Sequence, residues 1–377
     1  MAENTSIEWC DSSWNPWIGC TKVGPGCDHC YAEADFDLRK HRAKWGPGNP
    51  RSRTSPANWK KPLQWNAQPF SECMKCGWRG ELRDAEIVKN PPGFHPPVDS
   101  ASLCPGCHHP MLKAARRRVF CASLADVFDN EVPEQWRRDL FDLIRATPNL
   151  DWLLLTKRIG NAQRLFDDAH MVPFDGGSLY DWPANVWLGA TVVNQEEADR
   201  DIPKLLAVPA RVRWISAEPL LGPVDLSDYL RPKFRASSDP DWKDLHGPLD
   251  WVVVGGESGT NARPMHPEWA RSLRDQCEAA GVPFLFKQHG EWISGEDIDN
   301  CSLSSPEIAD ADQYFRVHSW PDRAESYRVG KKAAGRLLDG KLHHEFPSRP
   351  VVIGVDTAAL GADRTVYQIP AFLRRQS

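Results

Sequence analysis

The chain has 377 residues, a formal net charge of −5 and a sequence isoelectric point near 6.2, with 41% hydrophobic and 26% charged residues. These proportions are typical of a folded globular protein and exclude a long disordered chain. No apolar run approaches the roughly 20 residues of a membrane helix, and residues 1–10 lack the basic and apolar parts of an export signal, so we expect a cytoplasmic protein that does not enter membranes.

Short apolar segments alternate with longer helical patterns along the chain. The predicted strands cover residues 7–9, 118–123, 150–156, 186–192, 212–216, 249–254 and 283–286. The predicted helices cover residues 133–146, 159–170, 195–208 and 267–280. Buried strands that alternate with helices predict βα units around a parallel sheet. The predicted fold is therefore α/β, a partial or complete (β/α) TIM-like barrel, with a doubly wound open sheet as the alternative.

Two regions depart from this alternation and divide the chain into four parts. We expect residues 1–65 to form the first part of the barrel with a cysteine-rich loop, and residues 66–112 to form an inserted module. Residues 113–290 carry the main barrel units, and residues 291–377 form a C-terminal extension.

Four of the eleven cysteines form two C-x2-C pairs inside the insertion, Cys73 with Cys76 and Cys104 with Cys107. Each pair makes a turn that can direct two thiolates at one point, and four thiolates satisfy tetrahedral Zn²⁺. The 27 residues between the pairs exceed the usual zinc-ribbon spacing, so the arm between them must loop out. We predict a structural zinc site in a zinc-ribbon-like module; four unliganded thiols are the alternative.

A second cysteine cluster, Cys20, Cys27 and Cys30, lies in one short glycine-containing loop. Three thiolates suit a 4Fe–4S cluster that leaves one iron open for an exogenous ligand such as S-adenosylmethionine. The alternatives are structural thiols, or a second zinc site whose fourth ligand would be Cys10, His29 or His41.

Polar residues follow almost every predicted strand. In parallel α/β folds the carboxyl ends of the strands carry the chemistry, so these residues are expected to form a ring around one cavity. Carboxylates there suit an ammonium, a ribose or an exocyclic amine, and lysines suit a carboxylate or a phosphate. The candidate catalytic residues are Glu218, Glu257 and Lys287. The candidate cofactor-binding residues are Ser123, Asp126, Lys157, Thr191, Asn194 and Glu218.

Several stretches resemble the phage-associated three-cysteine-motif family, which is similar to radical-SAM enzymes. The matching stretches cover residues 14–20, 26–33, 123–128, 155–158, 218–223, 255–259, 262–265, 286–288 and 330–340. The resemblance implies a partial TIM barrel, a 4Fe–4S cluster on Cys20, Cys27 and Cys30, and S-adenosylmethionine as co-substrate. Two features depart from typical radical-SAM motifs. His29 replaces the aromatic residue before the last cysteine, and the Gly-Gly-Glu element that ends at Glu257 follows a late strand.

Residues 38–71 contain no acidic residue and alternate cationic with aromatic side chains. Cations contact phosphates and aromatic rings stack on bases, so this segment is a candidate nucleic-acid interface. The residues singled out in it are Arg51, Arg53, Trp59, Lys60 and Lys61. The alternative is that the tryptophans pack in the core and the cations are solvated.

These observations lead to one principal functional hypothesis and one alternative. The first is a radical-SAM-like enzyme that cleaves S-adenosylmethionine reductively and modifies or repairs a substrate, with nucleic acid favoured over a peptide or a small molecule. It needs an electron donor such as flavodoxin or ferredoxin and leaves room for a partner protein. The alternative is a non-enzymatic, metal-bearing nucleic-acid-binding protein of phage origin.

Overall fold

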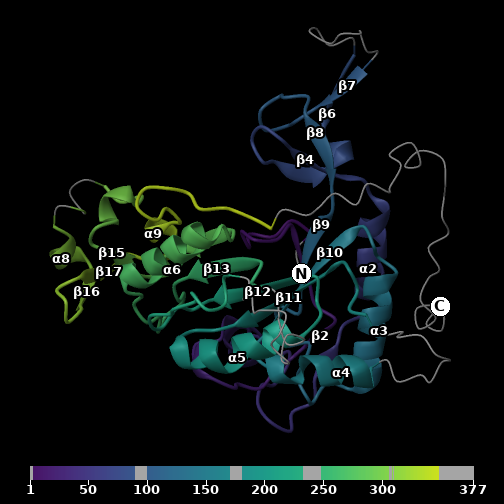
Figure 1. Cartoon of the computed structure of the whole chain (residues 1–377), viewed down its shortest axis with the longest axis horizontal. Helices are drawn as coiled ribbons and strands as arrows, with labels where there is room; N and C mark the ends of the chain where they lie inside the picture. The colour runs from purple at the N-terminus through teal and green to yellow at the C-terminus, as the bar shows by residue number, and fades with distance from the viewer. Residues whose placement is uncertain are drawn as a thin grey trace, which may run out of the picture.

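The structure, a computed structural model, describes residues 3–89, 100–169, 181–231, 248–304, 308 and 310–347. Its centre is a seven-stranded parallel sheet with helices around it (Figure 1). The strands follow one another across the sheet in the order β1-β9-β10-β11-β12-β13-β14. Their bounds are β1 Ser12–Trp14, β9 Arg117–Cys121, β10 Leu150–Thr156, β11 Val186–Thr191, β12 Val212–Ala217, β13 Trp251–Gly255 and β14 Phe284–Gln288.

The strand order distinguishes between the two predicted architectures. A doubly wound sheet reverses its strand order at a switch point, whereas a barrel adds each strand beside the previous one. Here the order across the sheet is the order along the chain, and β1 and β14 form its two edges. The fold is therefore a partial, TIM-like barrel, and the doubly wound alternative is excluded.

The larger helices pack around the outside of the curled sheet (Figure 1); α5 contacts β11 and β12, and α6 contacts β13 and β14. Helix α6 begins with Pro267 at its first position and ends at Gly281, whose φ of 68° suits glycine at this place. The helix bounds are α1 Tyr31–Glu33, α2 Pro56–Ala67, α3 Glu134–Arg145, α4 Ala162–Asp168, α5 Gln195–Ala207, α6 Pro267–Ala280, α8 Ala311–Tyr314 and α9 Lys331–Ala334. The four predicted helices are α3, α4, α5 and α6; α2 was not predicted.

A small aromatic core fills the inner side of the sheet, separate from the larger core between sheet and helices. Trp9 packs in it against Phe120 and Trp214, with ring centroids 4.4 Å and 5.3 Å away. A Cβ at Gly189 would lie 2.4 Å from the Trp214 ring, so only glycine fits beside this indole. The prediction of a strand over residues 7–9 is wrong, because Trp9 belongs to a turn that enters the barrel before β1 begins.

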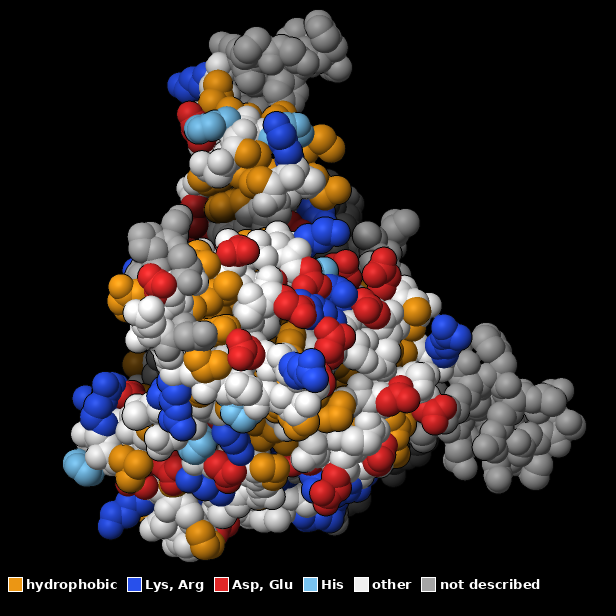
Figure 2. Space-filling view, turned by 90° about the vertical axis from the view of Figure 1, so that its left-hand side faces the viewer, with side chains coloured by type: hydrophobic (Ala, Val, Ile, Leu, Met, Phe, Trp, Pro, Cys, Tyr) orange, Lys and Arg blue, Asp and Glu red, His pale blue; other side chains and the backbone are white. Residues whose placement is uncertain are grey.

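Between α2 and β9 the chain forms a small module that protrudes from the body (Figure 1). It contains one three-stranded antiparallel sheet and a two-stranded one. On the face shown in Figure 2, hydrophobic side chains gather on this module, whereas acidic and basic side chains are interspersed over the body. The strands are β4 Phe70–Cys73, β5 Arg79–Glu81, β8 Leu112–Ala115, β6 Glu86–Lys89 and β7 Ser100–Leu103.

The C-terminal part adds a three-stranded antiparallel sheet of β15 Ile293–Ser294, β17 Glu325–Arg328 and β16 Arg316–Ser319. The chain then returns along β14, where Phe286 N donates to His343 O at 3.1 Å and Glu345 N donates to Phe284 O at 3.2 Å. Two further short strands, β2 Trp17–Ile18 and β3 Ser52–Arg53, pair near the N-terminus. Within the described residues, none of the helices has the length and apolar character that crossing a membrane requires.

Candidate functional site

A cavity of about 650 Å³ lies at the carboxyl ends of the parallel strands. Because the strands all run in the same direction, the loops that follow them meet at this edge of the sheet. The residues predicted at six different strand ends therefore come together around one space, as the barrel hypothesis requires. The predicted residues that line the cavity are Ser123, Asp126, Lys157, Thr191, Glu218, Glu257 and Lys287.

Asn194 is the exception among the predicted cofactor-binding residues. Its side chain accepts a hydrogen bond from the backbone N–H of Glu197 at 2.9 Å and so caps the N-terminus of α5. An asparagine in this role satisfies one of the unpaired N–H groups of the first helical turn. Asn194 is not among the residues that line the cavity, so the structure does not bring it together with the other predicted cofactor-binding residues.

The loop of residues 20–30 places all three of its cysteines, Cys20, Cys27 and Cys30, on the wall of the same cavity. The loop packs closely against the strand ends: a Cβ at Gly26 would lie 2.9 Å from Val193 Cγ1 and 3.3 Å from Lys157 Cε. Glycine at this position lets the loop approach Lys157. Each thiol of a cubane cluster binds a different iron, so the three sulfur atoms need to face one space rather than converge on one point.

Arg158 connects the cysteine loop to the sheet. Its guanidinium donates to Cys20 Sγ at 3.4 Å, to Asp126 Oδ2 at 3.1 Å and to the backbone oxygen of Thr21 at 2.5 Å. Asp126 in turn accepts from Thr156 Oγ1 at 2.7 Å. Burial raises the pKa of the Cys20 thiol to about 11; the nearby Asp126 carboxylate adds to the rise and Arg158 opposes it. The Arg158 guanidinium, itself paired with Asp126, thus donates a hydrogen bond to the Cys20 sulfur.

The two departures from the radical-SAM motif contact each other. His29 Nδ1 lies 3.0 Å from Glu257 Oε2, which also accepts from the backbone and side chain of Arg263, each at 2.8 Å. Burial raises the pKa of Glu257, but the hydrogen bonds from Arg263 lower it more, so the net shift is downward. Arg263 also donates to Asp28 at 3.0 Å and to Pro25 O at 2.9 Å. Glu257 is therefore ionised and contacts the cysteine loop through His29, while Arg263 contacts the loop through Asp28 and Pro25.

Glu218 and Lys287 form an ion pair of 2.8 Å inside the cavity. Ser216 Oγ also donates to Glu218 Oε2 at 3.1 Å. Burial lowers the pKa of Lys287, but the Glu218 carboxylate raises it by more, so the lysine stays charged. The pair can offer a carboxylate and an ammonium group to a ligand.

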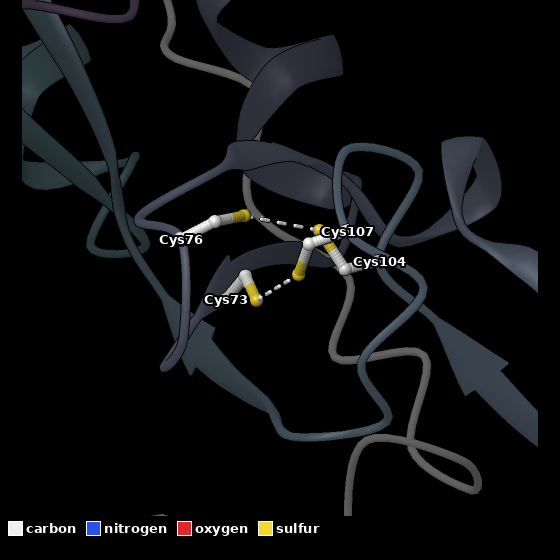
Figure 3. Close-up of side chains that lie close together, drawn as sticks. All are labelled: Cys73, Cys76, Cys104 and Cys107. Atoms are coloured by element: carbon white, nitrogen blue, oxygen red, sulfur yellow. Dashed lines mark hydrogen bonds between the residues drawn. The ribbon is translucent and has the colours of Figure 1, made fainter.

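The four cysteines of the protruding module also come together (Figure 3). Cys73 Sγ lies 3.6 Å from Cys107 Sγ, and Cys76 Sγ lies 3.5 Å from Cys104 Sγ. All four sulfur atoms lie within 4.8 Å of one another, so this group could hold one metal ion. Backbone N–H groups of Cys76 and Lys75 and the neighbouring thiols lower the pKa of Cys73 to about 6, which favours a thiolate. Among the residues that the structure describes, no other set of three or more histidine, cysteine or carboxylate side chains lies close enough together to hold a metal ion in this way.

A family model for proteins of unknown function, DUF5131, matches residues 4–347. The chain belongs to this family. The match spans the barrel, the cysteine loop and the protruding module, and its description names no activity. No curated protein and no solved structure matches the chain. The similarity to the phage-associated three-cysteine-motif family and to radical-SAM enzymes therefore stays a prediction.

In this DUF5131 protein the residues predicted to contact nucleic acid separate into two groups. The Arg51 guanidinium is buried against Asp129 at 2.7 Å and Glu131, and the Trp59 ring is 1% exposed. These placements correct the prediction that Arg51 and Trp59 contact nucleic acid, because neither side chain reaches the surface. Arg53 is partly exposed, pairs with Asp139 at 2.6 Å and lies over the Trp59 ring. Lys60 and Lys61 are exposed on α2.

Sequence reasoning assigned no role to three residues that shape this DUF5131 site, although Gln288 lies at a predicted strand end and in a stretch that carries the family resemblance. Arg263, which holds both Glu257 and the cysteine loop, lies in one of the stretches that carry the family resemblance, and that position was its only signal. Glu8 and Gln288 both line the cavity. Glu8 precedes the sheet, and no pattern of strands and helices points to such a residue.

Proposed function

We propose that this DUF5131 protein is a radical-SAM-like enzyme. Cys20, Cys27 and Cys30 would hold a 4Fe–4S cluster, and S-adenosylmethionine would bind in the cavity beside it. The observation that carries the proposal is that three cysteines from one loop share a single cavity of about 650 Å³ with the polar ends of six parallel strands. A cavity of this size accommodates a nucleoside-sized cofactor together with part of a substrate.

The donor set fits this cofactor. Three thiolates leave one iron of a cubane without a protein ligand, which is the position that an exogenous ligand needs. Held by Cys20, Cys27 and Cys30, such a cluster would supply reductive, radical chemistry with S-adenosylmethionine as co-substrate.

The chain's own residues bind and orient the reactants. The Lys157 ammonium lies beside the cysteine loop and 3.3 Å from Thr191 Oγ1, so it could bind a carboxylate of a ligand in the cavity. Glu257 and Arg263 fix the loop from the opposite strand end. The Glu218–Lys287 pair offers one acceptor and one donor to the ribose or to the substrate.

The protruding module would hold a structural zinc ion. Four cysteines leave no open coordination position, so this ion would serve folding rather than catalysis. The enzyme would act in the cytoplasm with an electron donor such as flavodoxin or ferredoxin and has room for a partner protein; the substrate class we propose is nucleic acid, of phage or host origin.

The experiment is anaerobic purification followed by iron, sulfide and zinc analysis and a reductive assay for 5′-deoxyadenosine. We expect about four iron, four sulfide and one zinc per chain, together with 5′-deoxyadenosine that forms only when a reductant is present. Zinc in both sites and no iron after anaerobic reconstitution would overturn the enzyme and favour the metal-bearing binding protein.

Arg158 is a positioning residue in this proposal, and its test is electrochemical. Hydrogen bonds to the cluster sulfurs set the reduction potential. Arg158→Met removes the donor and the positive charge beside Cys20, so we expect the midpoint potential of the cluster to become more negative while iron content is kept. Potentiometric titration followed by electron paramagnetic resonance measures it. Arg164→Met, on the exposed side of α4, is the matched control; equal potentials in both variants would contradict the role of Arg158.

A nucleic-acid substrate predicts a specific salt dependence. If Lys60 and Lys61 both contact phosphates, the Lys60→Ala/Lys61→Ala double variant should lower the slope of log K against log salt by roughly 2. Fluorescence anisotropy with a labelled oligonucleotide at several salt concentrations measures this slope. Lys341→Ala, an exposed lysine far along the chain, serves as the control. A slope that stays the same in the double variant would exclude α2 from the interface.

A further inference from the structure

One aromatic residue of the cavity wall, Tyr31, stays exposed. It follows Cys30 directly and is 61% exposed. Of the large hydrophobic side chains that are exposed in the described part of the chain, Tyr31 is the only one that lines the cavity. The other aromatic residues of the wall, Trp9, Trp45 and Phe120, are buried in hydrophobic cores. An aromatic ring left uncovered beside a cavity can offer its face to a ligand.

The hydroxyl group holds the Tyr31 side chain in place. Tyr31 Oη donates a hydrogen bond to the backbone oxygen of Ser123 at 2.5 Å, and Ser123 also lines the cavity. The side chain therefore reaches from the cysteine loop to the residues that follow β9. Because the ring is fixed both at its backbone and at its hydroxyl, it loses little conformational freedom when a ligand binds. Tyr31 is thus a preorganised contact surface.

The turn that accepts this hydrogen bond is itself strained. Ala122 is buried and has a φ of 63°, in the left-handed region that residues other than glycine rarely adopt. The buried side chain of Asn15 holds the turn: its Oδ1 accepts from Leu124 N at 2.7 Å and its Nδ2 donates to Ser123 Oγ at 2.9 Å. Strained backbone persists where surrounding contacts enforce it, and such positions cluster at ligand-binding sites. The turn and Tyr31 therefore form one built feature of the cavity wall.

The charged residues of the cavity wall narrow the class of ligand. The cations among them are Lys22, Lys157, Arg158, Lys287 and Lys331. The carboxylates are Glu8, Asp126, Glu218 and Glu257. A wall of both kinds can meet a ligand that carries donors and acceptors on its edges, whereas a purely apolar ring would bring no partner for these groups. A heteroaromatic base has a flat face for Tyr31 and polar edges for the wall.

We propose that Tyr31 is a stacking platform for a heteroaromatic base. The inference rests on the proposed function, because it names the chemistry of what binds beside the cysteine loop. The base is either that of a nucleic-acid substrate or the adenine of S-adenosylmethionine. Both sources present the same flat π-face, and the experiment distinguishes them.

The experiment is equilibrium dialysis of the anaerobically purified full chain with two kinds of probe, the nucleotides AMP, GMP, CMP and UMP, and S-adenosylmethionine. Stacking on an aromatic side chain changes the affinity for a base by about 5-fold or more. We expect Tyr31→Leu, which removes the ring but keeps an apolar side chain, to raise the dissociation constant of at least one probe by that factor. Tyr31→Phe keeps the ring and should bind that probe more tightly than Tyr31→Leu. Tyr314→Leu is the matched control and should bind as the wild type does, because Tyr314 is also 61% exposed but does not line the cavity.

A loss of affinity that includes S-adenosylmethionine identifies its adenine as the occupant, and a loss confined to nucleotides identifies a substrate base; both results support the platform. Equal dissociation constants for Tyr31→Leu and the wild type, no measurable binding of any probe, or Tyr31→Phe binding no better than Tyr31→Leu would overturn it. Dialysis of the nucleotides needs neither iron nor a reductant. An iron-free chain whose nucleotide binding depends on Tyr31 would refute the enzyme and keep the platform, whereas 5′-deoxyadenosine formation together with binding that does not depend on Tyr31 would do the reverse.

Discussion

If the protein holds the proposed 4Fe–4S cluster and zinc ion, replacing Cys27 by alanine is expected to remove the iron and to leave the zinc in place. The Cys27 side chain is buried at the wall of the cavity, and two remaining thiolates cannot hold a cubane that needs three. Formation of 5′-deoxyadenosine should fall to the level of the reaction without protein. Metal analysis of the anaerobically purified variant, with the 5′-deoxyadenosine assay in parallel, measures both effects.

A variant in the other cysteine group is the control for this prediction. Cys73→Ala should lose the zinc and keep the iron, since Cys73 belongs to the compact group of four thiols in the protruding module. Cys301→Ala changes a cysteine outside both groups and should keep both metals. Loss of iron from Cys73→Ala, or iron that remains in Cys27→Ala, would show that the two cysteine groups are not two independent metal sites.

The second large effect is expected in stability. Arg51 is fully buried and donates through Nε to Asp129 at 2.8 Å, to Glu131 and, through Nη1, to the backbone oxygen of Asn49 at 2.9 Å. Arg51→Met leaves these partners without their cation, and breaking a buried pair in this way costs about 3–5 kcal/mol. Urea unfolding followed by circular dichroism should show this loss in the free energy of unfolding.

Lys60→Met is the matched variant, because Lys60 is exposed and lies within ten residues of Arg51 in the same basic segment. It should change the free energy of unfolding by no more than about 0.5 kcal/mol. If Arg51→Met instead left stability unchanged and weakened binding of an oligonucleotide, the placement of Arg51 as a buried structural cation would be wrong.

The barrel could be predicted from sequence because its signals are local. The strand predicted over residues 150–156 and the helix predicted over residues 267–280 have the same bounds in the structure. All strands of a parallel sheet end at the same edge, so the polar residues that follow them meet there. The ring of polar residues could therefore be predicted from the fold class. A strand was wrongly predicted at residues 7–9 because an apolar residue there suggested one. Trp9 instead belongs to the aromatic core inside the barrel.

The misplaced exposure of Arg51 and the missed contact between His29 and Glu257 share one physical cause. Whether a cation contacts solvent or a carboxylate depends on partners that are distant in sequence, and Arg51 meets Asp129 across 78 residues. Helix α2 was missed because Pro62 lies inside it and its apolar residues are few. The contact between His29 and Glu257 joins residues 228 positions apart. No pattern within a short window shows such pairs.

The pairing of β1 with β9 has a consequence for how the protein folds. Strands β9 to β13 each pair with the next strand of the sheet along the chain, but β1 pairs across a long interval, with Ser12 opposite Val119. Closing a long loop costs more chain entropy than closing a short one, so we expect β1 to dock after the other six strands. The cysteine loop follows β1 directly. Its thiols would therefore stay accessible to solvent until β1 docks.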